Sequence, residues 1–219
     1  MLTADPGARQ DVAQKQATFQ LFYGSLAPTA LSSISLAISA TAGLEVVPEP
    51  LQSELPPGKQ FAKTIAVRCV GPYALPTATL SFVVNGSARQ IQFRLPLPIS
   101  RFMEPVALEP GPFMATWGKV PAGAPLEGQQ VVTLPPAAAD GSTDLVAAAV
   151  AKLTKLGLQA VPQADPKPTN LVAASKFGSV PIMLRVETAA GKARLTLRST
   201  DATVTAEVLA QVAFELAAP

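Results

Sequence analysis

Hydrophobic and polar positions alternate in short runs along the first part of the chain. Residues 17–23 are rich in aromatic and β-branched side chains and stop at Gly24. Residues 31–38 and 61–69 alternate strictly, so that one side of each run is mostly apolar. A period of two residues is typical of half-buried β-strands. These runs therefore predict strands that each bury one face.

Two further runs, residues 77–84 and 89–97, flank Asn85-Gly86. This dipeptide is typical of a two-residue hairpin turn. Residues 45–58 contain four prolines, which favours an edge segment or a long connection over a central strand. None of the first 98 residues shows a convincing helical period. We therefore predict an antiparallel, immunoglobulin-like β-sandwich over residues 1–98.

The period changes in the second part of the chain, where strands and helices alternate. We predict an α+β platform over residues 99–219, an antiparallel sheet flanked by helices. The predicted helices cover residues 113–119, a segment capped by Ser142-Thr143-Asp144 that ends near Gly157, and a last segment capped by Ser199-Thr200-Asp201. The other predicted segments are strands at 158–161, 171–174, 180–187 and 192–198, a turn at 165–168, and loops at 121–136 and 188–191.

The last predicted hairpin separates its side chains by chemistry. Its leucines and Val186 alternate with charged residues, so the apolar face is expected to receive the helices. The opposite face then presents Arg185, Arg194, Arg198 and Glu187 together. An ordinary solvated sheet face would give the same pattern. Three arginines on a rigid sheet are nevertheless well suited to bidentate recognition of carboxylates.

Trp117 is the only tryptophan in the chain, and Phe113 precedes it by four residues. At this spacing the two rings share one face of a helix. Aromatic side chains in this arrangement are most often core residues. If they lie over the arginine-bearing face, they form an aromatic floor with a cationic rim. Such a surface would suit short acidic peptides with aromatic anchors.

Composition restricts the possible chemistry. The chain has 219 residues, 22 of them proline, which is about twice the usual share and predicts many bends and edges. The net charge of +2 argues against a nucleic-acid binder. No apolar run is long enough to span a membrane. The single cysteine, Cys69, lies in an alternating run and is expected to be buried in a reducing, cytosolic protein.

The chain contains no histidine, which removes the Ser-His, Cys-His and His-metal constellations. It also lacks the glycine-rich phosphate and dinucleotide motifs. We therefore expect no cofactor and no enzyme activity. A hydrolase that uses paired carboxylates or a Ser-Lys pair stays open as an alternative, although no motif for one is present.

Several short motifs together carry a resemblance to a known family. Their order and rough spacing along nearly the whole chain matter more than any one of them. They are Leu21-Phe22-Tyr23-Gly24, Gly58-Lys59-Gln60 leading to Arg68-Cys69, Arg94-Leu95-Pro96 through Arg101-Phe102 to Pro105, Phe113-x-x-x-Trp117, Asp165-Pro166-x-Pro168-x-Asn170, Leu184-Arg185-x-Glu187, and Arg194-Leu195-Thr196-Leu197-Arg198 followed by Asp201-x-x-Val204. In these residues the chain resembles the appendage (ear) domains of alpha-adaptins, subunits of the plasma-membrane clathrin adaptor.

The resemblance implies a β-sandwich followed by a platform, without enzyme activity. It implies a domain that recruits disordered endocytic accessory proteins through short linear motifs. Asp-Pro-Phe/Trp and Phe-x-Asp-x-Phe peptides would bind a platform patch whose floor contains Phe113 and Trp117, with Met114 where the family usually has a second aromatic. The rest of this platform patch is its charged rim, which comprises Arg185, Glu187, Arg194 and Arg198.

A second surface implied by the resemblance, the sandwich patch, would bind Trp-x-x-Phe motifs. It maps to Phe22, Gly24 and Gln60, with Arg9 where a lysine is usual. Without the resemblance, Phe22 would be assigned to the core and Gln60 to the surface. The family also implies a cytoplasmic protein at clathrin-coated pits, peripheral to the plasma membrane. Its other partners would be the remaining adaptor subunits, with no nucleic acid and no direct membrane insertion.

Related coat subunits, the beta-adaptin ear and the coatomer gamma-subunit ear, are the alternatives within the same structural class. They share the two-part fold and a platform tryptophan. The run from Arg194 to Arg198, together with Phe22 and Gln60, favours alpha-adaptin.

Overall fold

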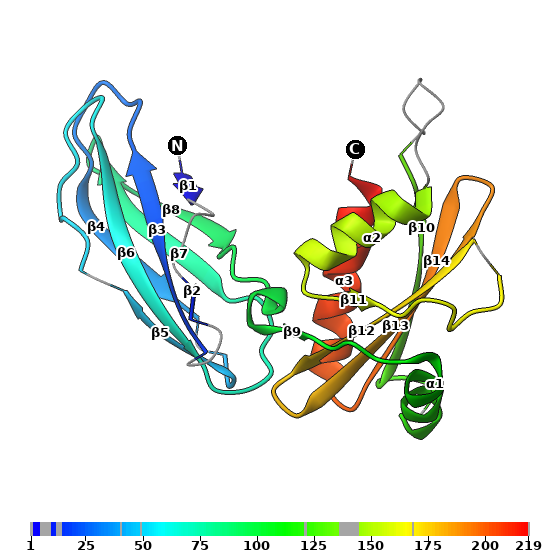
Figure 1. The fold of residues 1–219 in the computed structure, drawn as a ribbon. Helices are drawn as coiled ribbons and strands as arrows, with labels where there is room; N and C mark the ends of the chain where they lie inside the picture. Colours follow the sequence, from blue (N-terminus) through cyan, green and yellow to red (C-terminus); the bar gives the residue numbers. More distant parts are fainter. Residues whose placement is uncertain are drawn as a thin grey trace. The chain divides into compact units, whose positions relative to one another are not determined.

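The structure is a computed structural model that describes residues 2–4, 10–11, 15–39, 41–48, 50–120, 122–135, 145–167 and 169–218. The chain forms two compact units, residues 1–97 and 98–219, and both are built mainly of antiparallel strands (Figure 1). Three predicted features lie outside the described residues. They are Arg9 of the sandwich patch, the helix cap at Ser142–Asp144, and Pro168 at the end of the predicted turn.

The first unit contains a five-stranded and a three-stranded antiparallel sheet. The five-stranded sheet has the order β1-β3-β6-β5, and β2 also pairs with β3. The predicted strands at residues 17–23 and 61–69 are the two central strands, β3 and β6. The proline-rich segment supplies the edge strand β5, as its composition indicated. The bounds are Leu2–Ala4 for β1, Gln10–Asp11 for β2, Gln16–Gly24 for β3, Leu44–Pro48 for β5 and Gln60–Cys69 for β6.

The three-stranded sheet has the order β4-β7-β8, with β4 at Ser32–Ile38, β7 at Thr77–Val84 and β8 at Ser87–Arg94. The turn between β7 and β8 consists of Asn85 and Gly86, with φ of 50° and 73°. Two consecutive positive φ values match a type I′ turn, which Asn-Gly favours. The sequence-based prediction of this hairpin is therefore confirmed.

The two sheets of the first unit share one hydrophobic core. Tyr23 of β3 packs with Ile34 of β4 and Leu80 of β7, and Leu55 completes this buried cluster. All four side chains are almost fully excluded from solvent. Strand alternation explains the arrangement, because every second residue of each strand faces the other sheet.

The second unit is organised on a six-stranded antiparallel sheet. Its order is β10-β14-β13-β12-β11, and β9 also pairs with β12. The unit begins with a short 3-10 helix at Ile99–Phe102. The strand bounds are Glu104–Pro105 for β9, Glu127–Thr133 for β10, Gln159–Ala160 for β11, Asn170–Phe177 for β12, Val180–Ala189 for β13 and Lys192–Ser199 for β14.

Strand β10 corrects the sequence-based assignment of residues 121–136 to a loop. It pairs along its whole length with β14. Its helix-facing side carries Gly128 and Gln130 before Val132, so the hydrophobic alternation that marks a strand is missing from the sequence. A Cβ atom on Gly128 would lie 2.7 Å from Leu209 of the last helix, which explains the small residue at this position.

The turn between β13 and β14 is shorter than the predicted loop at residues 188–191. Ala189 pairs directly with Lys192, so only Ala190 and Gly191 form the turn, with φ of 48° and 72°. Cross-strand pairing therefore continues beyond the charged residues. This pairing fixes the register of the arginine-bearing face, because each residue of a two-residue hairpin has one defined partner.

Two helices pack on one face of the sheet, α2 at Leu145–Lys155 and α3 at Ala202–Ala217. The chain leaves α2 through Gly157 at φ 76°, close to the predicted end of that helix. Asp201 caps α3, and its carboxylate accepts a hydrogen bond from the Val204 amide. Both helix predictions are confirmed within the described residues. Among all the residues that the structure describes, no helix has the length and hydrophobicity needed to cross a membrane.

Helix α1, at Pro110–Lys119, packs on the opposite face of the sheet (Figure 1). Phe113 of α1 contacts Ala174 of β12 and Met183 of β13, which are directly paired in the ladder. Leu184 and its cross-strand partner Leu197 point to the other face, where α3 lies. Helices thus cover both faces of the sheet. Because α1 is short, part of the sheet face on which it packs stays free for charged residues.

Candidate functional site

The aromatic pair lies on α1, which begins three residues before the predicted helix. Pro110 and Pro112 occupy its first turn, where a missing amide hydrogen has no cost because that group would lack a helical partner. Phe113 and Trp117 lie one turn apart on the same side of the helix. Their ring centroids are 5.9 Å apart and their planes differ by 20°, so the rings are stacked.

Phe113 lies beneath Trp117 and does not form an exposed floor. Its side chain is 1% exposed and packs against Val172, Ala174 and Met183 of the sheet. Trp117 is half-buried against the same cluster. Phe113 therefore positions the indole, while Trp117 is the ring that a ligand can reach. Sequence spacing identifies the pair but cannot rank the two rings by exposure.

Arg198 contacts both the ring and the backbone of Trp117. Its Cζ atom lies 4.4 Å from the Trp117 ring centroid, and its Nη1 donates a 3.2 Å hydrogen bond to the Trp117 carbonyl oxygen. Its Nε donates a 2.7 Å hydrogen bond to Glu127 of β10. The guanidinium thus combines a cation–π contact with an ion pair. The indole therefore contacts both Phe113 and Arg198.

Met114 is the exposed neighbour of this aromatic pair. Its side chain is 53% exposed on α1. A flexible thioether in this position offers an adaptable apolar contact in place of a rigid ring. The three α1 residues of the platform patch therefore differ in exposure, from the buried Phe113 through Trp117 to Met114.

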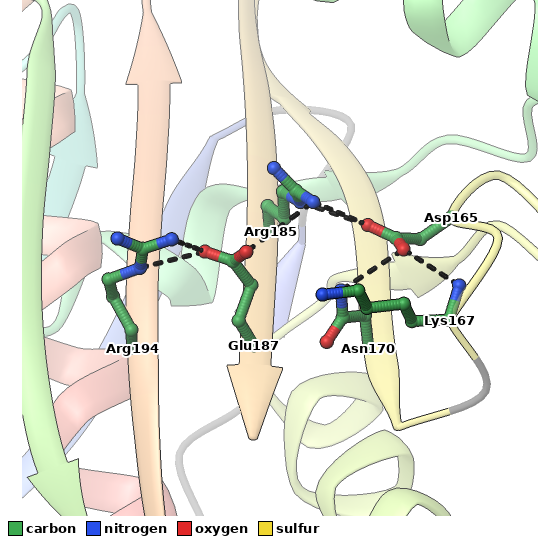
Figure 2. Close-up of polar contacts among 6 residues, drawn as sticks. All are labelled: Asp165, Lys167, Asn170, Arg185, Glu187 and Arg194. Atoms are coloured by element: carbon green, nitrogen blue, oxygen red, sulfur yellow. Dashed lines mark hydrogen bonds and ion pairs between the residues drawn. The ribbon is translucent and has the colours of Figure 1, made fainter. Parts of the chain in front are cut away.

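The arginine-bearing face predicted from alternation is present on β13 and β14. Glu187 pairs with Arg194 across the two strands, and Arg185 lies two residues before Glu187 on the same face. The Glu187 carboxylate contacts both arginines: Arg194 Nε at 2.8 Å and Nη2 at 2.5 Å, and Arg185 Nη2 at 3.4 Å (Figure 2). One carboxylate therefore holds two guanidinium groups in place.

Arg185 also binds Asp165, which sequence analysis did not assign to the site. The Asp165 Oδ2 atom accepts hydrogen bonds from Arg185 Nε and pairs with Nη2, both at 2.9 Å. The Oδ1 atom accepts 3.0 Å bonds from the Lys167 backbone amide and the Asn170 side chain (Figure 2). Asp165 is therefore a positioning residue that links the turn to Arg185.

Hydrogen bonding lowers the pKa of two carboxyl groups in this network. Burial raises the pKa of Asp165, but the hydrogen bonds from Lys167, Asn170 and Arg185 outweigh that effect and the net shift is downward. The pKa of Glu127 is lowered by hydrogen bonds from Gln129 and Arg198. Both groups are thus ionised at neutral pH, and each stabilises the arginine that it contacts.

The carboxylates change the expected electrostatics of the arginine face. Each arginine of the rim has an anionic neighbour, so the formal charges of the network cancel. The arginine side chains differ in exposure: Arg194 is 57% exposed, Arg185 40% and Arg198 18%. A ligand carboxylate can therefore reach Arg194 and Arg185, whereas Arg198 mainly holds Trp117. Preorganised donors of this kind suit a directional polar contact more than a strong general attraction to anions.

The sequence gives little indication that Asp165 and Glu127 are partners of the rim arginines. Asp165 and Asn170 lie in one of the motifs that carried the resemblance, but nothing in that motif names Arg185 as their partner. Glu127 lies 71 residues from Arg198 in a segment assigned to a loop. Long-range strand pairing brings it to the site.

The sandwich patch lies in the first unit, on the side of β3 that faces away from the core. Phe22 is half-buried there, between the core residues Leu21 and Tyr23. Gly24 pairs directly with Gln60 of β6, and a Cβ atom on Gly24 would lie 3.5 Å from that of Gln60. The structure thus brings Phe22, Gly24 and Gln60 to one face. The role of these residues stays a prediction.

Comparisons with known proteins provide a separate line of information. Residues 101–216 match the family described as Alpha adaptin AP2, C-terminal domain. The alpha-2 subunit of the AP-2 complex of Dictyostelium discoideum is 30% identical over 208 residues, which covers 91% of this chain and 20% of that protein. The alpha-1 subunit of the AP-2 complex of Arabidopsis thaliana is 27% identical over 199 residues, which covers 86% and 19%.

The chain spans about a fifth of the length of these curated relatives. Among solved structures, the GAE domain of yeast GGA1 is similar with a TM-score of 0.38 and 12% identity, over 44% of this chain and 91% of that domain.

Proposed function

We propose that this chain, which belongs to the alpha-adaptin C-terminal domain family, recruits partner proteins by binding short linear peptides on its platform patch. The observation that carries the proposal is the half-buried Trp117, which contacts Phe113 and Arg198 on the face of the sheet that also carries the Arg185–Glu187–Arg194 network. A preformed aromatic surface next to oriented polar groups favours a peptide with an aromatic anchor and a nearby carboxylate.

The chemistry of this surface matches Asp-Pro-Phe/Trp and Phe-x-Asp-x-Phe motifs. An aromatic side chain of the peptide would pack against the accessible part of Trp117 and contact Met114. Its carboxylate would accept hydrogen bonds from the exposed edges of Arg185 and Arg194. Neither contact requires the network around Asp165 and Glu187 to break, because both arginines retain exposed donor groups.

The platform patch is expected to bind short peptides weakly. One aromatic anchor and a few charge-assisted hydrogen bonds give affinities on the order of micromolar after the cost of ordering a disordered ligand. Partners that carry several motif copies would gain affinity through avidity. We propose that these partners are disordered endocytic accessory proteins, and that the chain acts with the other adaptor subunits on the cytoplasmic side of clathrin-coated pits.

A binding role agrees with the features of the described site better than a catalytic one. The arginines and carboxylates neutralise one another in fixed pairs, an arrangement that suits recognition of a polar ligand more than proton transfer. The family match to alpha adaptin also favours this subunit over the ears of beta-adaptin or coatomer gamma.

Replacement of the half-buried but accessible Trp117 tests the proposal. Titration calorimetry with an Asp-Pro-Phe peptide should show at least about a tenfold loss of affinity for Trp117→Ala, because the aromatic contact is removed. Phe214→Ala is the matched control, since Phe214 is a 75% exposed aromatic residue on α3, away from the patch. Unchanged affinity in a folded Trp117→Ala protein would contradict the assignment.

The sandwich patch is a second candidate surface, supported by the grouping of Phe22, Gly24 and Gln60 on one face of β3 and β6. We propose that it binds Trp-x-x-Phe motifs. Gln60→Ala should weaken a Trp-x-x-Phe peptide without affecting an Asp-Pro-Phe peptide. Equal effects on both peptides would place the Trp-x-x-Phe site elsewhere.

A further inference from the structure

Strand β8 is an edge strand with one free side. It is the last strand of the β4-β7-β8 sheet, and within the described part of the chain no strand pairs with its second edge. All of its residues are exposed except the half-buried Phe93. An edge of this kind presents unpaired amide and carbonyl groups, to which another extended segment can add.

The turn geometry identifies the free backbone groups. In a hairpin with a two-residue turn, the pair that closes the turn is hydrogen-bonded, and here that pair is Val84 and Ser87. Hydrogen-bonded and non-hydrogen-bonded pairs then alternate, so Arg89 and Ile91 direct their backbone groups toward β7. Gln90 and its neighbours two residues away, Ala88 and Gln92, direct theirs to the free edge.

The inner face of β8 borders a cavity. Ile91 pairs with the core residue Leu80 and is itself 43% exposed. A cavity of about 350 Å³ lies between the two sheets of the first unit, which is within the size range of small binding pockets. It is mainly apolar, and its lining includes Tyr23, Ile34, Leu80, Phe82, Val84 and Ile91. Because Ile91 forms part of the wall, the cavity extends to the edge strand.

A cation lies next to this cavity. Arg89 precedes Ile91 by two residues and pairs with Phe82, so it occupies the same face of the sheet as two lining residues. Among the described residues none forms an ion pair or hydrogen bond with its exposed side chain. Every arginine of the platform rim has a carboxylate neighbour, and Arg89 therefore differs from them in being available to an anionic ligand.

We propose that an extended peptide adds as a further strand to the free edge of β8. An acidic side chain of the peptide lies beside Arg89, and an apolar side chain two positions away enters the cavity beside Ile91. When the added strand is antiparallel, these two positions form non-hydrogen-bonded pairs with it, in which opposing Cα atoms are only about 4.5 Å apart and side chains are closest. The recognised pattern is acidic-x-apolar in one strand direction and apolar-x-acidic in the other.

This surface is distinct from the platform patch, and it meets the sandwich patch at Gly24, which also lines the cavity. The platform patch belongs to the second unit. The sandwich patch lies on the side of β3 and β6 that faces away from the core, whereas the cavity adjoins the core side of β3 through Tyr23.

The test uses the full chain with Trp117→Ala and Gln60→Ala, which weaken the other two surfaces. Two synthetic ten-residue peptides are added, one with a central Asp-Thr-Phe and one with Phe-Thr-Asp, both flanked by alternating Thr and Val. We expect amide chemical-shift changes at Ala88, Gln90 and Gln92 with at least one peptide. Hydrogen exchange at the same amides should become slower. No change at these amides with either peptide at millimolar concentration would overturn it.

Matched variants separate the parts of the proposal. Gln90→Pro removes one outward amide hydrogen, which an edge strand tolerates, and should abolish the shift changes at Ala88 and Gln92 while Gln90→Ala preserves them. Arg89→Gln should weaken binding about tenfold. Arg94→Gln, on the other face of β8, should leave affinity unchanged. Equal effects of the Arg89 and Arg94 variants would show a general charge effect and overturn the assigned contact.

Discussion

Arg198 stacks its guanidinium on Trp117, with Cζ 4.4 Å from the ring centroid, and also donates a hydrogen bond to the carbonyl oxygen of the same residue. The third contact of this side chain is the ion pair with Glu127. One residue of β14 thus connects α1 to β10. The connection places the only tryptophan of the chain at the exposed edge of a packed cluster, where it can be both fixed and accessible.

Replacement of Arg198 should change both the environment of Trp117 and the stability of the second unit. Arg198→Lys retains a positive charge but cannot stack on the ring and donate to two acceptors at once. We expect a loss of about 1–2 kcal/mol in the unfolding free energy of the second unit and a red shift of tryptophan emission. Trp117 is the only source of this signal, so fluorescence reports the site directly. If the variant has the same tryptophan emission and stability as the original protein, the Arg198 contacts do not hold Trp117 in place.

Charge reversal at Arg194 tests the polar part of the patch. Arg194→Glu places two carboxylates side by side, because Glu187 is its cross-strand partner. We expect acidic peptides to bind at least about tenfold more weakly, and their affinity to depend less on salt, since an exposed attractive pair has been lost. Calorimetry at low and high ionic strength measures both effects.

Arg68→Glu is the control for this charge change. It alters the net charge equally, at a residue that is 61% exposed and lies in the first unit beside Glu45. It should leave platform binding almost unaltered. If both reversals reduce binding equally, the attraction comes from net charge and not from Arg194.

Acid should weaken the second unit through Asp165. The pKa of this carboxyl is lowered in the folded protein, so its stabilising effect is complete above the unfolded pKa of about 3.9 and is lost as the pH falls through the folded value. Asp165→Asn should therefore reduce the unfolding free energy by about 1–3 kcal/mol at neutral pH, and this difference should shrink in stronger acid. Urea titrations followed by tryptophan fluorescence at several pH values measure it.

Glu45→Gln serves as the reference for this experiment. Glu45 pairs with Arg68 at the surface, where an ion pair contributes little. We expect no comparable pH-dependent difference. A difference between Asp165→Asn and the unmodified chain that stays constant down to strong acid would show that the carboxylate charge is not responsible.

The contact between β10 and α3 depends on a glycine. A Cβ atom at Gly128 would lie 2.7 Å from Leu209 Cδ2 and 3.3 Å from Thr205 Cγ2, so Gly128→Ala should destabilise the second unit by about 1–3 kcal/mol. Gly118→Ala in α1 meets nothing within 4 Å and should stabilise that helix by about 0.5–1 kcal/mol. Thermal unfolding of the two variants should therefore shift in opposite directions. A shift in the same direction would contradict the packing argument.

Local signals in the sequence were sufficient for most of the elements. The Asn85-Gly86 turn, the strand alternation around the last hairpin, and the Asp201 cap of the last helix each depend on neighbours within a few residues. Strand β10 was missed because Gly128 and Gln130 occupy its helix-facing side, where the sequence lacks the usual hydrophobic residues. Only pairing with β14 reveals it as a strand.

For the site, the sequence by itself determined that Arg185, Glu187, Arg194 and Arg198 share one face of a sheet and that Phe113 and Trp117 share one side of a helix. These placements follow from the fixed periods of strands and helices. Only the tertiary structure decided that Phe113 is buried while Trp117 is accessible, and that Asp165 and Glu127 neutralise the rim. Exposure and charge pairing depend on which distant segments meet, and no local period encodes that.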